Sequence, residues 1–128
     1  MKLEVPIGPG ELVDKITILE IKAAHLSSPE KLANVRVELR ALEAARDAAI
    51  QSSPALQELT AALKDVNAVL WRIEDDIRDC ERAGDFGPTF IALARSVYRQ
   101  NDERAALKRR INELLAAEIV EEKSYAAY

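Results

Sequence analysis

The sequence predicts an all-α fold: an antiparallel bundle of about four helices, with a long, coiled-coil-like C-terminal hairpin and a short extended arm at the N-terminus. Of its 128 residues, 48% are hydrophobic, 31% are charged and only 5% are aromatic. Strands favour aromatic and β-branched residues, so this composition favours helices. Apolar residues also recur at steps of three and four, as on one face of a helix. The length is that of one domain, which we expect to span residues 1–128.

The N-terminal third is predicted to contain the arm and a first helix. Residues 1–10 are expected to be extended, because two prolines and two glycines fall between positions 6 and 10. The first helix is predicted over residues 11–26. Its apolar residues lie on two faces, since Ile18 and Ile21 point away from the stripe that contains Leu12 and Ile16. We therefore expect this helix to lie centrally in the bundle or to be shared with another subunit.

Three further helices are predicted over residues 29–51, 54–83 and 88–122. The first two begin with a proline that directly follows a serine able to cap the helix. Apolar residues of the third predicted helix alternate steps of three and four, as in a heptad seam. They are Leu56, Leu59, Leu63, Val66, Leu70, Ile73, Ile77 and Cys80. Gly84 suits the end of this helix, and two long helices joined by a short loop should pack antiparallel.

Polar residues interrupt the apolar stripe of the last helix and flank that of the helix before it. These candidate ligand- or partner-binding residues are Asn67, Trp71, Glu74, Arg78, Asn101, Arg104, Lys108 and Asn112. If the chain turns near residue 87, facing positions have numbers that sum to about 175. This register places Glu74 near Asn101, Trp71 near Arg104 and Asn67 near Lys108.

The polar residues have two interpretations that the sequence leaves open. One is a structural layer that fixes the register of the helices, as buried polar residues do in coiled coils. The other is a pocket for a small anionic ligand, with Arg104 and Lys108 donating positive charge and Glu74 orienting the ligand.

Several function classes find no support in the sequence. The net charge of −4 argues against a nucleic-acid surface, and no phosphate-binding loop, nucleophile elbow or catalytic triad is present. With His25 and Cys80 as the only histidine and cysteine, we expect no metal, no cofactor and no disulfide. No apolar run has the length of a signal sequence or a membrane span, so we expect a cytoplasmic protein without a membrane partner.

Five strings resemble those of a bacterial family of small, all-helical proteins with no assigned activity. They are GELVDKITILEIK at 10–22, LWRIED at 70–75, ARSVYRQND at 94–102, LKRRIN at 107–112 and EEKSY at 121–125. The resemblance implies one intact domain that covers nearly the whole chain. It implies no catalytic residue, but the strings include polar residues such as Asp14, Lys15 and Lys22, which favours a ligand or partner surface.

These observations together favour a non-catalytic helical module that binds another protein or itself, for example as a homodimer. The alternative is a protein or enzyme that binds a small anionic molecule between the last two helices.

Overall fold

The structure is a computed structural model that describes residues 1–128 and contains four helices and no strand. The helices are α1 (Pro9–His25), α2 (Pro29–Ala49), α3 (Pro54–Ala83) and α4 (Pro88–Leu114). The predicted all-α class is confirmed. None of the four helices combines the length and the apolar composition that a membrane crossing requires.

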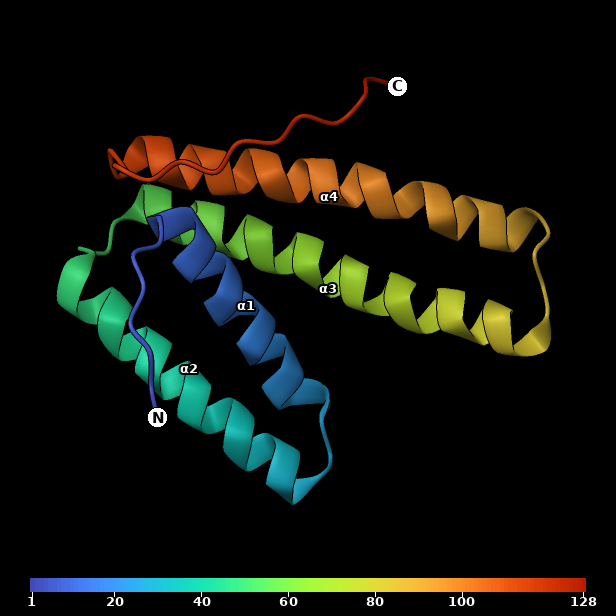
Figure 1. Ribbon diagram of the computed structural model, residues 1–128, viewed down its shortest axis with the longest axis horizontal. Coiled ribbons are helices and arrows are strands. Elements are labelled where there is room, and N and C mark those ends of the chain that lie inside the picture. Colours follow the sequence, from blue (N-terminus) through green and yellow to red (C-terminus); the bar gives the residue numbers. More distant parts are fainter.

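The helices form two antiparallel hairpins, α1–α2 and α3–α4, that diverge from a common end (Figure 1). The first residues of α1 and α3 and the last residues of α2 and α4 meet at that end, whereas the two hairpin turns lie far apart. α1 packs against all three other helices, but α2 packs against α1 alone. The two apolar faces of α1 are thus explained by its central position.

The helix ends follow the predicted signals. The hydroxyl groups of Ser28 and Ser53 accept backbone hydrogen bonds at the starts of α2 and α3, at 3.5 and 3.1 Å. Gly84 ends α3 in the left-handed conformation, with φ of 66°, where glycine has no steric penalty. Each of the four helices has a proline in its first turn. A backbone N–H at this position would have no partner within the helix, so its absence in proline costs no hydrogen bond.

The hydrophobic core is small and lies where the two hairpins converge. It is formed by Val13 of α1, Leu56 and Leu63 of α3, and Leu107 and Ile111 of α4. Every member of the predicted α3 seam is buried or half-buried. Only 19 of the 128 residues are buried in all, so much of the chain lies at the surface.

The ends of α1 and α2 lie at His25 and Ala49, one and two residues before their predicted positions. Two other differences affect the site. α1 begins at Pro9 rather than residue 11, because proline is compatible with the first helical position. α4 ends at Leu114 rather than residue 122: Ala116 has a positive φ of 50°, and the N–H of Ala117 donates to the carbonyl of Asn112 at 2.9 Å. The chain then reverses, and residues 115–128, which we call the C-terminal tail, run back over α4 (Figure 1).

The reversal of the tail is stabilised by ion pairs that a continued helix could not form. Glu121 pairs with Lys108 at 2.8 Å, and Glu122 pairs with Arg109 at 3.1 Å. Farther along, the rings of Tyr128 and Tyr98 pack edge to face, with centroids 4.9 Å apart. Side-chain contacts with the preceding helix therefore outweigh the helical propensity of residues 115–122.

Candidate functional site

Different faces of α1 contribute to two neighbouring features. One face carries Asp14 and Thr17, which are buried against α3 and α4. The adjoining face carries Val13, Ile16 and Glu20, which line a cavity between α1, α2 and α3. We call the first feature the Asp14 cluster and the second the α1–α2–α3 groove. The Asp14 cluster consists of Glu11, Asp14, Thr17, Asn67, Arg104, Lys108, Asn112 and Glu121.

The carboxylate of Asp14 is the centre of the cluster and is only 1% exposed. Arg104 of α4 donates to both of its oxygens, from Nε at 2.9 Å and from Nη2 at 2.6 Å. Asn67 of α3 donates from Nδ2 to the Asp14 carboxylate at 2.9 Å and to the Thr17 hydroxyl at 3.0 Å. A buried charge is tolerated only when it is paired and hydrogen-bonded, and here α3 and α4 supply the partners.

Lys108 links α1, α4 and the tail. Its Nζ lies 2.7 Å from a carboxylate oxygen of Glu11 and 2.8 Å from one of Glu121. Burial lowers the pKa of Lys108, but hydrogen bonds to the two carboxylates outweigh burial and leave the pKa above its ordinary value. The same contact with Lys108, aided by Lys123, lowers the pKa of Glu121 to about 2. Lys108 and Glu121 are therefore both charged near neutral pH.

The first turn of α1 approaches α4 closely. The N–H of Gly10 donates to the side-chain carbonyl of Asn112 at 2.8 Å. A Cβ atom at Gly10 would lie 2.4 Å from the backbone carbonyl oxygen of Lys108, and one at Gly8 would lie 2.6 Å from that of Ile119. Only glycine fits at these positions, so the start of α1 is fixed against α4 and the tail.

The structure brings four of the eight predicted site residues together. Asn67, Arg104, Lys108 and Asn112 all belong to the Asp14 cluster, as the preceding contacts show. The other four, Trp71, Glu74, Arg78 and Asn101, do not. Trp71 packs against His25 with ring centroids 5.2 Å apart, and Glu74 pairs with Arg78 on the surface. Asn101 is exposed.

The structure gives Arg104 and Lys108 other hydrogen-bonding partners than the predicted ones. Arg104 contacts Asp14 rather than the ring of Trp71, and Lys108 contacts Glu11 and Glu121 rather than Asn67. The reason is that α1 lies against both long helices and supplies carboxylates to which their cations bind. Sequence reasoning missed Glu11, Asp14, Thr17 and Glu121 as partners. A signal was present in α1, where Asp14 and Thr17 stand between apolar residues at helical spacing.

The chemistry of the Asp14 cluster is that of a satisfied internal network. Three carboxylates face two cations, and no buried polar side-chain atom lacks a hydrogen-bond partner. No group of three or more histidine, cysteine, aspartate or glutamate side chains is placed to hold a metal ion. The cluster thus has no surplus positive charge, and it fixes α1 against α3, α4 and the tail.

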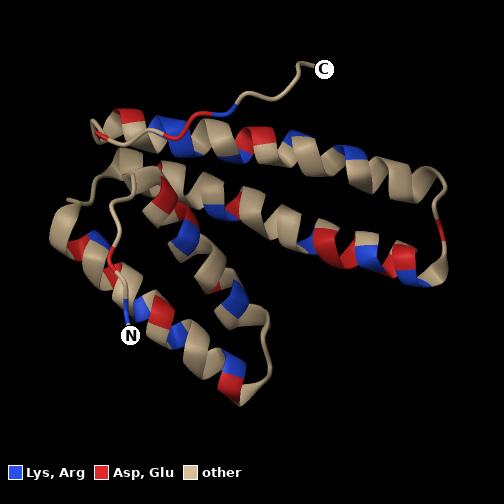
Figure 2. Cartoon of the chain, in the orientation of Figure 1, with Lys and Arg blue, Asp and Glu red and all other residues tan.

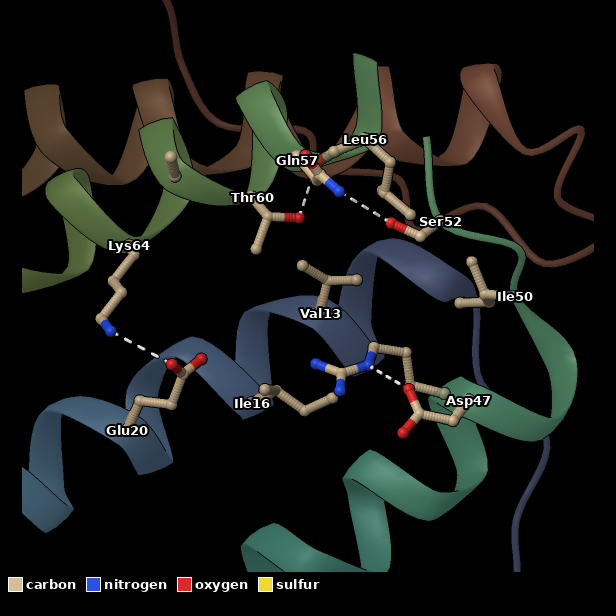
Figure 3. Close-up of a pocket in the computed structure, with 12 residues that line it drawn as sticks. Val13, Ile16, Glu20, Asp47, Ile50, Ser52, Leu56, Gln57, Thr60 and Lys64 are labelled. Carbon is tan, nitrogen blue, oxygen red and sulfur yellow. Dashed lines mark hydrogen bonds and ion pairs between the residues drawn. The ribbon is translucent and has the colours of Figure 1, made fainter. Parts of the chain in front are cut away.

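The α1–α2–α3 groove has a volume of about 430 Å³ and exists because α2 does not pack against α3 (Figure 3). Its walls include the apolar side chains of Val13, Ile16, Ile50 and Leu56. Two ion pairs lie beside them, Glu20 with Lys64 at 3.1 Å and Arg46 with Asp47 at 2.9 Å. The groove therefore combines apolar side chains with internally neutralised charges.

The fold and these two features define a helical protein of two divergent hairpins, with a polar network that fixes the central helix and an open groove beside it. The protein belongs to the family described as "Family of unknown function (DUF6165)", whose model matches residues 1–128. The expected membership of a family without an assigned activity is thus confirmed. No curated protein and no solved structure matches the chain.

Proposed function

We propose that this protein is a non-catalytic interaction module that self-associates. The observation that carries the proposal is its solvent-accessible surface of 8945 Å². A compact monomer of 14.2 kDa would expose only about 6,800 Å². The excess is larger than the roughly 800 Å² that each partner buries in a standard protein–protein interface.

The excess surface has identifiable sources. The two extended segments, residues 1–7 and 118–128, are exposed throughout. α2 contributes only Val35 to the buried residues, because its sole neighbour is α1. An arrangement of this kind leaves side chains uncovered that a second subunit can cover.

Exposed apolar side chains support the same proposal. Leu3 and Val5 of the arm are 78% and 69% exposed. Grouped apolar side chains at the surface of a protein mark association sites. Charges of both signs are interspersed on every helix (Figure 2), which favours a protein partner over a uniformly charged polymer.

The alternative function, binding of a small anionic ligand at Arg104 and Lys108, has a narrower basis. A hollow of about 180 Å³ lies between α4 and the tail and is lined by Lys108, Arg109 and Lys123. However, Lys108 and Arg109 already pair with Glu121 and Glu122, so an anion would have to displace the tail. The self-association account predicts that anionic metabolites stabilise wild type and Lys108→Met equally or not at all in a thermal-shift screen. Stabilisation of the wild type alone would favour the ligand alternative.

Thermal unfolding at different protein concentrations tests self-association. Association stabilises the folded chain by mass action, so the unfolding midpoint of a dimer rises with concentration. We expect a rise of several degrees over a roughly hundredfold concentration range. A midpoint that stays constant over that range would contradict the proposal.

A further inference from the structure

The N-terminal arm, residues 1–8, precedes α1, and its residues 1–7 are exposed. In a strand-like conformation side chains alternate between two sides, which would place Leu3, Val5 and Ile7 opposite Lys2 and Glu4. Leu3 and Val5 are 78% and 69% exposed, whereas Ile7 is 38% exposed. No backbone N–H or C=O group of residues 1–7 is hydrogen-bonded within the chain. The arm therefore has apolar side chains that are not covered and backbone groups that are not hydrogen-bonded within the chain.

The α1–α2–α3 groove offers what the arm lacks. Its lining includes Ile50, which is half-buried, and Ile16 and Leu56, which are only 1% and 6% exposed, and these apolar side chains match those of the arm in chemistry. At its edge, Gln57 donates one amide hydrogen to the hydroxyl of Ser52 at 3.0 Å and keeps its carbonyl oxygen and second amide hydrogen for other partners. Both residues are exposed, so they can bond an extended backbone.

Charge and hydrogen bonding in the groove also favour an apolar occupant. Two ion pairs lie in the groove, Glu20 with Lys64 and Arg46 with Asp47, and within each pair the positive and negative charges cancel. No buried polar side-chain atom in the wall lacks a partner, so nothing in the groove requires a charged ligand. The side of the arm that would remain outside carries Lys2 and Glu4, whose charges cancel.

The arm of the same chain is held away from this groove. Its root at Gly8 is extended, with φ of −74° and ψ of 156°, and lies between Pro6 and Pro9, whose rings restrict φ. Gly8 is also pressed against the tail carbonyl of Ile119. From there the arm runs away from α3 and α4 (Figure 1), and no arm residue lines the groove.

We propose that the α1–α2–α3 groove binds the N-terminal arm of a second copy, so that two chains exchange arms. This inference specifies the interface of the self-association proposed above and depends on it. Two arms in two grooves form a closed twofold dimer, in which each chain both gives and receives an arm. The excess accessible surface of each chain is large enough for such an interface.

Variants on the two sides of the arm test this inference. The double variant Leu3→Glu/Val5→Glu places two carboxylates on the apolar side, whereas Lys2→Glu makes the same change in net charge on the other side. Light scattering coupled to size exclusion would give the mass of each protein over a range of concentrations. We expect the double variant to weaken association by at least about tenfold, because charged groups are costly to bury, and Lys2→Glu to leave it within about twofold.

A matched pair on the helices tests the groove. Ala61 lines the groove and is exposed, and Ala92 is exposed on α4 outside it. We expect Ala61→Trp to fill the groove and reduce the mass to that of a monomer, and Ala92→Trp to keep the mass of the wild type. Circular dichroism checks that each variant keeps its helices, which exposed positions should permit.

Cross-linking identifies which arm enters the groove. A mixture of Val5→Cys and Ala61→Cys proteins, treated with a short thiol cross-linker, should yield a linked dimer, whereas Val5→Cys mixed with Ala92→Cys should not. If one chain that carries both Val5→Cys and Ala61→Cys is linked only within itself, the arm occupies its own groove and the inference is wrong.

The outcomes separate this inference from the proposal on which it depends. A wild type that is monomeric at all concentrations would overturn self-association itself. A wild-type dimer that persists unchanged in Leu3→Glu/Val5→Glu and in Ala61→Trp would overturn arm exchange and leave self-association standing.

Discussion

The guanidinium group of Arg104 on α4 forms two hydrogen bonds with the carboxylate of Asp14 on α1, at 2.9 and 2.6 Å, although the residues are 90 positions apart in the chain. Asp14 is almost fully buried and Arg104 is 31% exposed. The pair joins the two hairpins where they converge. The position of α1, and with it the shape of the groove, therefore depends on the neutralisation of one buried charge.

Removal of the Asp14 carboxylate should destabilise the protein strongly. Asp14→Ala leaves the guanidinium of Arg104 and the amide of Asn67 without their shared partner. We expect the free energy of unfolding in urea to fall by about 3 kcal/mol, the lower end of the range for breaking a buried pair, because Arg104 can turn partly towards water. The double variant Asp14→Leu/Arg104→Met should recover part of this loss, since it leaves no unpaired charge.

The exposed pair of Glu74 and Arg78 provides the matched control. Arg78→Ala should change the free energy of unfolding by less than about 1 kcal/mol, as is usual for surface ion pairs. Equal losses for Asp14→Ala and Arg78→Ala would mean that the Asp14 cluster does not hold the hairpins together.

Two glycine substitutions should differ in cost for different physical reasons. At Gly84 nothing lies within 4 Å of a new Cβ atom, so Gly84→Ala should cost about 1 kcal/mol from left-handed strain alone. At Gly10 the Cβ atom would meet the backbone of Lys108, which cannot rotate away, so Gly10→Ala should cost about 2–3 kcal/mol. Urea unfolding of both variants checks the order, and an equal or smaller loss for Gly10→Ala would show that α1 is not fixed against α4.

The packing of the C-terminal tail against α4 should weaken at low pH, where Glu121 becomes protonated. Lys108 and Lys123 lower its pKa from 4.5 to about 2 in the folded chain. A carboxyl group with a lowered pKa contributes stability above its unfolded pKa and loses it as the pH falls through the folded value. The difference in unfolding free energy between wild type and Glu121→Gln should thus be constant above about pH 5 and disappear towards pH 2.

The size of this pH effect should be modest. The Glu121 side chain is 46% exposed, and solvent weakens ion pairs at the surface, so we expect less than about 1 kcal/mol. An NMR titration gives the pKa of Glu121 directly. A value near 4.5 would show that the tail does not pair with Lys108 in solution.

Cys80 should react slowly with thiol reagents in the folded protein. It is buried in the α3–α4 seam, and burial, together with the nearby carboxylates of Asp85, Asp76 and Asp79, raises the pKa of its thiol. Because the thiolate is the reactive form, we expect modification at neutral pH to be at least about tenfold slower than in urea. Equal rates in the two conditions would place Cys80 outside the seam.

The helices were largely predictable because their signals are local. Serine, proline and glycine mark the starts and ends of α2 and α3, and a regular apolar stripe marks the inward face of α3. The end of α4 was not predictable in this way, because no breaker follows Leu114. It is determined by contacts of Glu121 and Glu122 with side chains one turn or more within the preceding helix.

The candidate site was half predictable for a similar reason. An amide or a cation within an apolar stripe signals a polar partner, which identified Asn67, Arg104 and Lys108. The identity of that partner depends on how α1 crosses the α3–α4 hairpin, and periodicity within one helix contains no information about the packing of another. Asp14 was therefore noted as a polar residue of the family strings but not recognised as the partner of Arg104, and the groove, which depends on the missing contact between α2 and α3, could not be predicted.

Sedimentation equilibrium of the wild-type protein over a range of concentrations is the most direct test of the proposed self-association. Self-association predicts a species with twice the 14.2 kDa mass of one chain, and a twofold arm exchange predicts no larger assembly. A single species of 14.2 kDa at every concentration would contradict it.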